Sequence, residues 1–596
     1  MKAIKLFRSG FAIVAGIVFA VLAVTALQAI ESGSNQPGDQ PYELADSNSL
    51  FGSYLAGRLA RSERDNVAAA EYYREALQKD PNSKDILEET FQLRIATGQF
   101  SDAGSLARQL VKRDKNQKIP NFYLGIKSFS DGKYSKADKY FKNGSQGPIM
   151  DLTGNLARAW VAAARGKADK ALKLATETTA TPTEISRQIE LLHRALIADV
   201  LKKREVAKRA YLELYGTKPR SVRALEAFVR HAIYWGDKEL AQKVLAPHIN
   251  DVTPNPLLKS LSDDIKAGKK IPLLISAPKD GLAEVFQGIG EALASDQVLD
   301  AGQVYLQLSL LIRPKFVVAN YALGELYDQQ KNYELAAKLF NKVPESSPLW
   351  LGAQMRSAYD YNALDRLPDA QKVLKKAIAA YPKDMRPYFT LGTILRANKK
   401  FADAIPYFTQ TIEHMGAPKK SHWSIYYARG VCYERTKKWA KAEADLQKAL
   451  ELDPDQGLAL NYLGYSWVDQ GTKVKEGMEL ILRAVQLRPN DGYFIDSLGW
   501  AYYRQHKYDE AVKHLEHAVE LKPSDPVIND HLGDAFYRVG RKLEAKYQWK
   551  QSLDLKPEPE DEKRIRKKLD TGVLVEPSER ASLETPVPSA SAQQSK

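Results

Sequence analysis

The chain has 596 residues, of which 44% are hydrophobic and 27% charged, and its formal net charge is +14. This length exceeds what one compact core holds, so we expect several domains or an array of repeats. The composition excludes a chain that is disordered throughout, and the single cysteine, Cys432, excludes an intramolecular disulfide or a cysteine-rich zinc site. The positive charge is spread thinly along the chain, so we expect no nucleic-acid partner.

The amino terminus has the pattern of an export signal. Lys2, Lys5 and Arg8 precede an uncharged, mostly apolar run from Ser9 to Ile30. This pattern predicts a signal peptide or membrane anchor over residues 1–30, which crosses a membrane through residues 10–27 if it is not cleaved. The polar linker 31–49 that follows is acidic and carries no Lys or Arg, which places the amino end inside and the rest outside. We therefore expect an exported protein in the periplasm, either free or anchored to the inner membrane.

A period of about 34 residues runs through the carboxyl half. The tripeptide Leu-x-Pro ends successive units at Pro454, Pro489, Pro523 and Pro557, at intervals of 35, 34 and 34 residues. Apolar residues inside each unit recur at the three- and four-residue spacings of a helix. Small residues are expected where the two helices of a unit cross, namely Gly392, Gly430, Gly464, Gly499 and Gly533 in the first helix and Ala404, Ala442, Ala511 and Ala545 in the second.

These markers resemble the tetratricopeptide (TPR) motif, from about Leu50 to Pro557. The resemblance implies an all-α fold, a TPR α-solenoid (superhelix) of about 14 helix-turn-helix repeats. The repeats are expected to start at residues 50, 84, 118, 152, 188, 222, 282, 317, 351, 385, 423, 457, 492 and 526. The expected organisation is a degenerate N-terminal array (50–250), an irregular joint (251–281), a C-terminal array (282–557), a charged, solvated helix (558–571) and a disordered tail (572–596).

The first helices of TPR repeats line a concave face, and the resemblance implies which residues do so here. Positions 2, 5, 9 and 12 of the late repeats hold Arg386, Arg396, Tyr427, Asn461, Tyr465, Asp496, Trp500, Tyr503, Asp530, Asp534 and Tyr537. Tyr, Trp and Arg dominate the energetics of protein interfaces, so a groove for a protein or an extended peptide is expected. Replacing Trp500 and Tyr465 by Ala then weakens partner capture and leaves melting nearly unchanged. The alternative is that these aromatic residues belong to the core.

No catalytic residue, metal or cofactor is expected. Gly288 and Gly290 form a G-x-G, but Leu293 occupies the site of the third glycine that a dinucleotide fingerprint requires. His514 and His517 have a spacing that can begin a metal site, but the repeat pattern places no carboxylate opposite them. Cys432 lies where a small buried hydrophobic residue is expected.

The last repeat, with His531, Gly533, Asp534 and Trp549, also resembles two groups of bacterial envelope TPR proteins. These are alphaproteobacterial proteins of envelope integrity and adaptors of a periplasmic carboxyl-terminal processing protease. The resemblance implies a non-catalytic scaffold that binds envelope proteins, or that protease and its substrates. Those adaptors are lipoproteins, however, and this chain has no lipid-accepting cysteine. A docking subunit of a secretion or polysaccharide-export machine remains an alternative. An enzyme decorated with TPRs is disfavoured, because too few residues lie outside the repeats.

Overall fold

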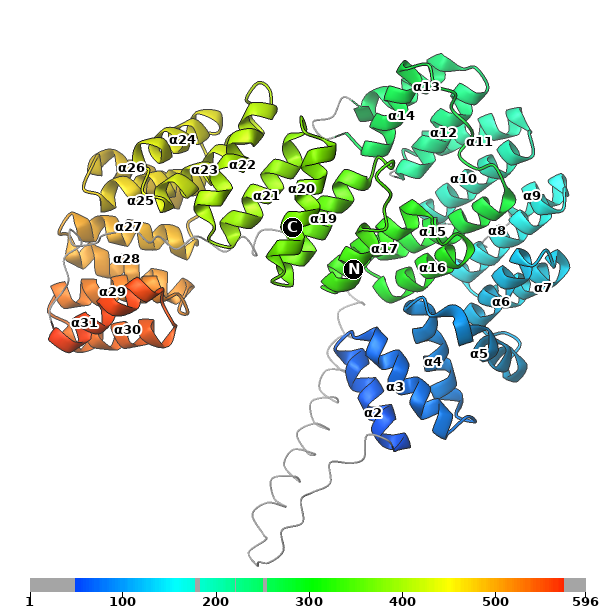
Figure 1. The fold of residues 1–596 in the computed structure, drawn as a ribbon, viewed down its shortest axis with the longest axis horizontal. Coiled ribbons are helices and arrows are strands. Elements are labelled where there is room, and N and C mark those ends of the chain that lie inside the picture. The colour runs from blue at the N-terminus through cyan, green and yellow to red at the C-terminus, as the bar shows by residue number, and fades with distance from the viewer. Residues whose placement is uncertain (1–48, 177–182, 220, 250–253, 573–596) are drawn as a thin grey trace, which may run out of the picture. The chain divides into compact units, whose positions relative to one another are not determined.

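The computed structural model describes residues 49–176, 183–219, 221–249 and 254–572, and in those residues it contains helices and no strand. Most helices form antiparallel pairs, each with an A helix followed by a B helix (Figure 1). The A helices are α2 (Leu50–Ser62), α4 (Lys84–Ala96), α6 (Lys118–Ser130), α8 (Pro148–Ala164), α10 (Glu184–Val200), α12 (Val222–Tyr234), α15 (Pro278–Ser295), α17 (Val317–Gln329), α19 (Trp350–Ala363), α21 (Met385–Ala397), α23 (Trp423–Arg435), α25 (Gly457–Asp469), α27 (Gly492–Arg504) and α29 (Pro526–Arg538).

The B helices follow in the same order. They are α3 (Asn66–Lys79), α5 (Phe100–Arg113), α7 (Tyr134–Gly144), α9 (Ala168–Leu174), α11 (Arg204–Gly216), α13 (Lys238–Ile249), α16 (Leu299–Ile312), α18 (Tyr333–Phe340), α20 (Leu367–Ala380), α22 (Phe401–His414), α24 (Trp439–Leu452), α26 (Val474–Leu487), α28 (Tyr508–Leu521) and α30 (Lys542–Asp554). Every A helix begins within four residues of a predicted repeat start. The all-α repeat fold expected from the sequence is therefore confirmed.

Small residues let the two helices of a pair approach each other. A Cβ added to Gly392 would lie 3.0 Å from the ring of Phe408, and one added to Gly499 would lie 2.6 Å from Leu515. In both pairs the large residue is 16 positions after the glycine, so it comes from the B helix of the same repeat. The alanines at the crossing are fully buried, namely Ala404, Ala442, Ala511 and Ala545. Gly430, Gly464 and Gly533 make equally close approaches to their own B helices.

The chain divides into two compact units between Leu93 and Arg94, inside α4, and the predicted joint between two repeat arrays at 251–281 stays a prediction. That joint contains a helix, α14 (Pro256–Lys266), and its residues 267–277 form no helix. The last helix, α31 (Pro559–Thr571), matches the charged helix predicted at 558–571. The leader 1–30, nearly all of the linker and the tail beyond Gly572 lie outside the described residues. Among the helices that are described, none is long and apolar enough to cross a bilayer.

Helices α15 and α16 cover the A helices of earlier repeats in the second unit. α15 packs against α8 and α10 as well as against α16, and α16 also contacts α6 (Figure 1). The approach is close, because a Cβ on Gly281 would lie 2.2 Å from the ring of Trp160. The hydroxyls of Thr153 and Tyr305 are 3.0 Å apart across the same seam. We call the surface of α6, α8, α10 and α12 the N-terminal A face, and the chain's own helices occupy it.

A buried ion pair reinforces this packing. Arg223 of α12 donates from Nε to Glu284 of α15 over 3.3 Å and also pairs with Glu226 of its own helix at 2.7 Å. Both carboxylates are nearly inaccessible to solvent, and Arg223 is also largely buried. The two carboxylates raise the pKa of Arg223 further above its usual value, although burial alone would lower it. Because removing one partner of such a pair leaves a buried charge alone, the contact fixes α15 in place.

Candidate partner-binding face

The predicted site residues lie on α21, α23, α25, α27 and α29, whose shared surface we call the C-terminal A face. Successive A helices contact each other directly: α21 with α23, α25 with α27 and α27 with α29. Polar contacts also cross from one repeat to the next, and they are the Tyr462 hydroxyl to Glu434 (2.8 Å), Trp500 Nε1 to Asp469 (2.9 Å), His531 Nδ1 to Asp496 (2.9 Å) and Arg538 Nε to the Tyr503 hydroxyl (3.3 Å). The A helices thus form one continuous seam.

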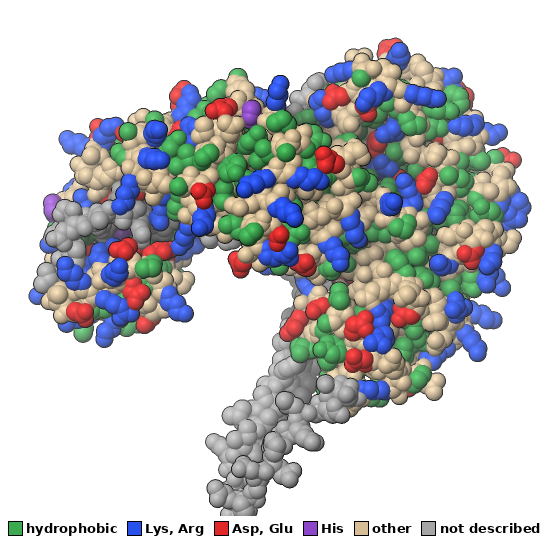
Figure 2. Space-filling view, viewed as in Figure 1, with side chains coloured by type: hydrophobic (Ala, Val, Ile, Leu, Met, Phe, Trp, Pro, Cys, Tyr) green, Lys and Arg blue, Asp and Glu red, His purple; other side chains and the backbone are tan. Residues whose placement is uncertain are grey.

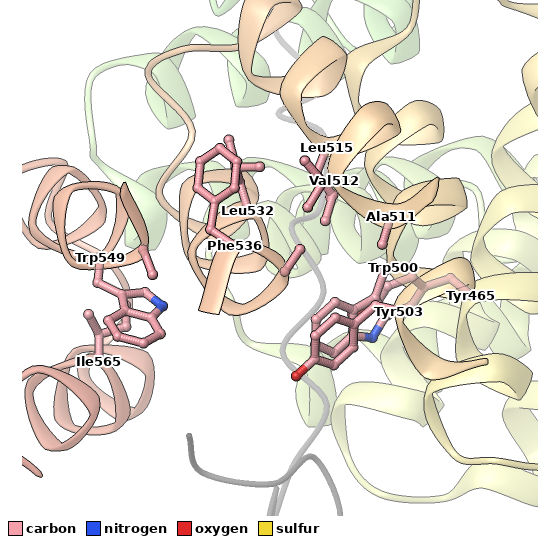
Figure 3. Close-up of a cluster of buried hydrophobic side chains, with 12 residues drawn as sticks. Tyr465, Trp500, Tyr503, Ala511, Val512, Leu515, Leu532, Phe536, Trp549 and Ile565 are labelled. Atoms are coloured by element: carbon pink, nitrogen blue, oxygen red, sulfur yellow. The ribbon is translucent and has the colours of Figure 1, made fainter. Parts of the chain in front are cut away.

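Trp500 lies at the centre of that seam and is fully buried. Its ring stacks on His531 at 4.1 Å and on Tyr503 at 4.6 Å between centroids. Figure 3 shows the Trp500 and Tyr503 rings face to face, with Tyr465 nearby, in one cluster with residues of α28 to α31. The expectation that replacing Trp500 and Tyr465 leaves melting unchanged is wrong for these buried side chains, because truncating a buried Trp costs about 3–5 kcal/mol.

The last repeat's part of the face is occupied by α31. Lys568, which is fully buried, donates to Asp530 over 2.7 Å and to Asp534 over 2.6 Å. Arg564 adds a 2.7 Å contact to Asp530, and the Tyr537 hydroxyl donates to the carbonyl of Gly572. Burial alone would raise the pKa of Asp530, but Lys568 and Arg564 outweigh it and hold that pKa well below its usual value. Asp530, Asp534 and Tyr537 are therefore engaged within the chain.

The expectation of a solvated final helix is thus wrong for α31. Ile565 and Lys568 have no exposed surface, and Ile565 joins the cluster around Trp549 (Figure 3). The charges of α31 belong to two sets. Lys563 and Arg566 face solvent, whereas Arg564 and Lys568, four residues apart, face the carboxylates of α29. The i, i+4 spacing of Arg564 and Lys568, with Ile565 between them, was the sequence signal for a buried face of α31. The other charged residues of the segment made it difficult to recognise.

At the other end of the face, the predicted residues Arg386, Arg396 and Tyr427 differ in their exposure and in their contacts. Arg386 is exposed and pairs with Asp384 at 2.6 Å, directly before its own helix. Tyr427 is almost buried, and burial raises its pKa to about 12 although the nearby cation Arg396 lowers it. Arg396 is half-buried and presents a guanidinium whose Nε has no hydrogen-bond partner in the described residues. Arg396 and Tyr427 therefore lie together, and Arg386 is held by its neighbour.

Four buried polar atoms on the face lack hydrogen-bond partners in the described residues. They are Thr393 Oγ1, Arg396 Nε, Asn461 Oδ1 and Arg504 Nη1, from α21, α25 and α27. The nearest carboxylate to Arg504 Nη1 is that of Asp469, at 3.8 Å. All four atoms belong to A helices, and such an atom costs about 1–3 kcal/mol if it stays unpaired. A peptide backbone along the face carries both donors and acceptors that these atoms need.

Sequence reasoning missed Asp469, His531 and Lys568, which organise this face. Asp496 and His531 are 35 residues apart, which is close to the repeat length. The period alone therefore predicts that they lie on neighbouring repeats. The pairing of a particular His with a particular Asp, however, requires the rotation of each helix about its axis. That rotation is a property of tertiary packing.

Cys432, His514 and His517, which were considered as catalytic or metal-binding candidates, make contacts within the fold. Cys432 is buried, and burial raises the pKa of its thiol to about 12, which opposes nucleophilic use. The His514 ring stacks on Tyr502 at 5.2 Å, and His517 pairs with Glu520 at 3.2 Å. Within the described ranges no three His, Cys, Asp or Glu residues are grouped to hold a metal ion. On the face that Figure 2 shows, Lys and Arg side chains are scattered among acidic and apolar ones and form no single basic patch.

Family models of the tetratricopeptide repeat match five segments, namely residues 60–119, 317–348, 356–418, 423–456 and 499–540. A curated relative is the TPR repeat-containing protein PA4667 of Pseudomonas aeruginosa, 30% identical over 198 residues. That match covers 33% of this chain and 33% of the relative. A second is a UDP-N-acetylglucosamine–peptide N-acetylglucosaminyltransferase of Giardia intestinalis, 29% identical over 19% of this chain and 8% of the enzyme. The chain thus spans a third or less of these relatives' length.

Three of the solved structures with similarity to this chain differ in coverage, identity and TM-score. YrrB, a TPR protein with an unusual peptide-binding site, is 23% identical over 30% of this chain and 90% of its own, with a TM-score of 0.25. A chain of the APC/C hetero-tetramer Cut9–Hcn1 is 14% identical over 88% of this chain and 97% of its own, with a TM-score of 0.37. MamA AMB-1 is 19% identical over 28% of this chain and 96% of its own, with a TM-score of 0.24.

Proposed function

Because the chain is a tetratricopeptide-repeat protein, we propose that it is a non-catalytic scaffold that binds an extended segment of a partner protein along the C-terminal A face. The observation that carries this proposal is the set of four unpaired polar atoms on α21, α25 and α27. A bound strand that donates to Asn461 and accepts from Arg396 and Arg504 satisfies atoms that the fold itself leaves unsatisfied. Hydrogen bonds that form only when the partner binds contribute to its affinity and fix the position of the bound segment along the face.

The proposal also includes a place of action. The basic start and apolar run of residues 1–30 support export, and they support an inner-membrane anchor if the run is retained. In that setting the scaffold gathers proteins of the bacterial envelope, either to maintain its integrity or to present substrates to a carboxyl-terminal processing protease. N-terminal sequencing of the mature chain from an envelope fraction tests the placement, because a chain recovered only from the cytoplasm rules it out.

The binding face is tested with Asn461→Leu, which removes an unpaired carbonyl oxygen and keeps a similar volume. Removing a buried group that has no partner is neutral or stabilising, so melting should stay constant or rise. Capture of the partner, measured by quantitative mass spectrometry of co-purified proteins, should fall by about tenfold for the loss of one good hydrogen bond in the complex.

Lys513→Leu, an exposed position on the B helix α28, serves as the matched control. It should leave the set of captured proteins unchanged. Equal loss of capture in both variants, or none in Asn461→Leu, would show that the C-terminal A face does not hold the partner.

A further inference from the structure

An acidic cluster lies on the A helices that precede the C-terminal A face. Glu325 and Asp328 of α17 gather around Arg356 of α19, at 2.9 Å from Nη2 and 3.4 Å from Nη1. Asp360, one turn after Arg356, adds a third carboxyl group next to Asp328. The cluster therefore holds three carboxyl groups and a single guanidinium. Its members lie on A helices, the class of helix that carries the proposed partner-binding residues.

Asp360 gives an independent sign that the cluster is incomplete. Its residue is 1% exposed, and its Oδ2 has no hydrogen-bond donor among the described residues. The carboxyl groups of Asp360 and Asp328 are close enough for a hydrogen bond between them. Two ionised carboxylates only accept hydrogen bonds, so this contact requires either a shared proton or a cation from outside.

The pKa values of the carboxyl groups around Asp360 agree with this geometry. Burial raises the pKa of Asp360 to about 8, with Asp328 as the second cause, and burial also raises the pKa of Glu325. On α15, burial raises the pKa of Glu291 to about 7. Arg356 opposes the pKa shifts of Asp360 and Glu325, and Gln287 and Arg223 oppose that of Glu291. The pKa values of the nearby Tyr321 on α17 and Tyr359 on α19 are also raised by burial. Three carboxyl groups, of Glu325, Asp328 and Asp360, thus share the single cation Arg356.

We propose that Asp328 and Glu325, with Asp360 behind them as a positioning residue, bind a lysine or arginine side chain of the partner segment. This inference rests on the proposed function, since it assigns a charge to one end of the same bound segment. Asp328 and Glu325 are each about one-third exposed, at 33% and 36%, so a cationic side chain reaches them. The later repeats offer Arg396 and Arg504, which favour an acidic residue at the other end. The two charges set the direction in which the segment lies.

A peptide cation fits the cluster better than a metal ion. In the part of the chain that the structure describes, no three potential ligands are arranged around a common point for a metal. A guanidinium or ammonium group needs only two carboxylates at hydrogen-bond distance.

The probe is fluorescein-labelled hexalysine, titrated by fluorescence anisotropy against the full chain at low ionic strength. Asp328→Asn should weaken hexalysine binding by about tenfold or more, the effect of losing one charge-assisted hydrogen bond. The matched control is Asp369→Asn, which removes the same charge from an exposed pair with Arg366 on α20. The control should change the affinity by less than about twofold.

Asp360→Asn separates binding from folding. Its amide donates to Asp328, so the variant should melt at the same or a higher temperature and still bind hexalysine more weakly. In the natural chain, calorimetry in two buffers of different ionisation enthalpy should show proton release on binding at pH 7, as the shared proton leaves. Asp360→Asn should abolish that release, which a purely structural role would not predict.

Three results overturn the inference. One is equal hexalysine affinity in the natural chain, Asp328→Asn and Asp369→Asn. Another is the absence of proton release. The third is stabilisation by millimolar Ca²⁺ that Asp328→Asn removes, which assigns the cluster to a metal. Failure of the proposed function is distinguishable, because Asn461→Leu then leaves partner capture unchanged while hexalysine binding stays dependent on Asp328.

Discussion

Along the N-terminal A face, α15 packs against α8 and α10, α16 contacts α6, and Arg223 of α12 pairs with Glu284 of α15. Along the C-terminal A face, the seam between A helices is closed by stacked aromatic rings and carboxylate contacts, and four polar atoms are left without partners in the described residues. Both faces are built from A helices of the same kind of two-helix repeat. The first has become the core of a larger unit, and the second retains groups suited to a ligand.

The difference depends on a few side chains. Gly281 admits the ring of Trp160, so α15 approaches the earlier A helices closely. On the C-terminal A face, Arg396, Asn461 and Arg504 stand where such an approach would bury polar groups. Burying a polar group without a partner is costly, so among the described helices none is expected to pack over these three residues as α15 packs on the N-terminal A face. The chemistry of the A helices thus decides whether a groove is filled from within.

The largest expected effect compares two fully buried tryptophans, Trp160 and Trp500. Each change to Ala should cost about 3–5 kcal/mol through the cavity it leaves. Hydrogen exchange should report different regions, because Trp160→Ala exposes α8 and α15 together and Trp500→Ala exposes α25 to α29. If α15 keeps its protection in Trp160→Ala, the N-terminal A face is not held by this contact.

A second comparison concerns α31, the helix that fills the last repeat's part of the C-terminal A face. Lys568→Met leaves Asp534 buried without its cation and Asp530 with Arg564 alone, and should cost about 3 kcal/mol or more of the local stability of α31. Lys563→Met, an exposed cation on the same helix, is the control and should cost less than about 1 kcal/mol. Hydrogen exchange of residues 559–571 measures both, and similar protection in the two variants would contradict the assignment of Lys568.

The same contact predicts a dependence on pH. The pKa of Asp530 is held below its unfolded value of about 3.9, so the carboxylate contributes its full stabilisation above about pH 5. That contribution is lost as the pH falls through 4 towards the folded-state pKa. Exchange of α31, corrected for the intrinsic rate at each pH, should therefore rise between pH 5 and pH 3. In Lys568→Met this additional change should be small.

The smallest effect distinguishes two glycines of α15. Gly288 has open space where a Cβ would be, whereas a Cβ on Gly290 would lie 3.0 Å from Leu306 of α16. Gly288→Ala should therefore stabilise the chain by about 0.5–1 kcal/mol, since Ala costs less backbone entropy in a helix. Gly290→Ala should destabilise it by about 1–3 kcal/mol through overpacking. Scanning calorimetry that gave both variants the same sign would refute this description of the α15–α16 contact.

Part of this molecule could be predicted from the sequence, and particular residues show where prediction ended. Gly392 and Phe408, or Gly499 and Leu515, are 16 residues apart in one repeat, so the period alone places them together. Asn461 and Arg396 were expected on the partner-binding face and have unpaired polar atoms there. Trp500 and Asp530 were expected on it too, but Trp500 is stacked inside the seam and Asp530 is paired with α31.

The sequence by itself determined the helix pairs and their order, because the spacing of apolar and small residues is a local property that repeats along the chain. Only the tertiary structure decided that α15 fills the N-terminal A face and that α31 fills the end of the C-terminal one. Such contacts join segments far apart in the chain, such as Thr153 and Tyr305, which are 152 residues apart, and they depend on how each helix is rotated in its stack. No repeat period encodes that rotation.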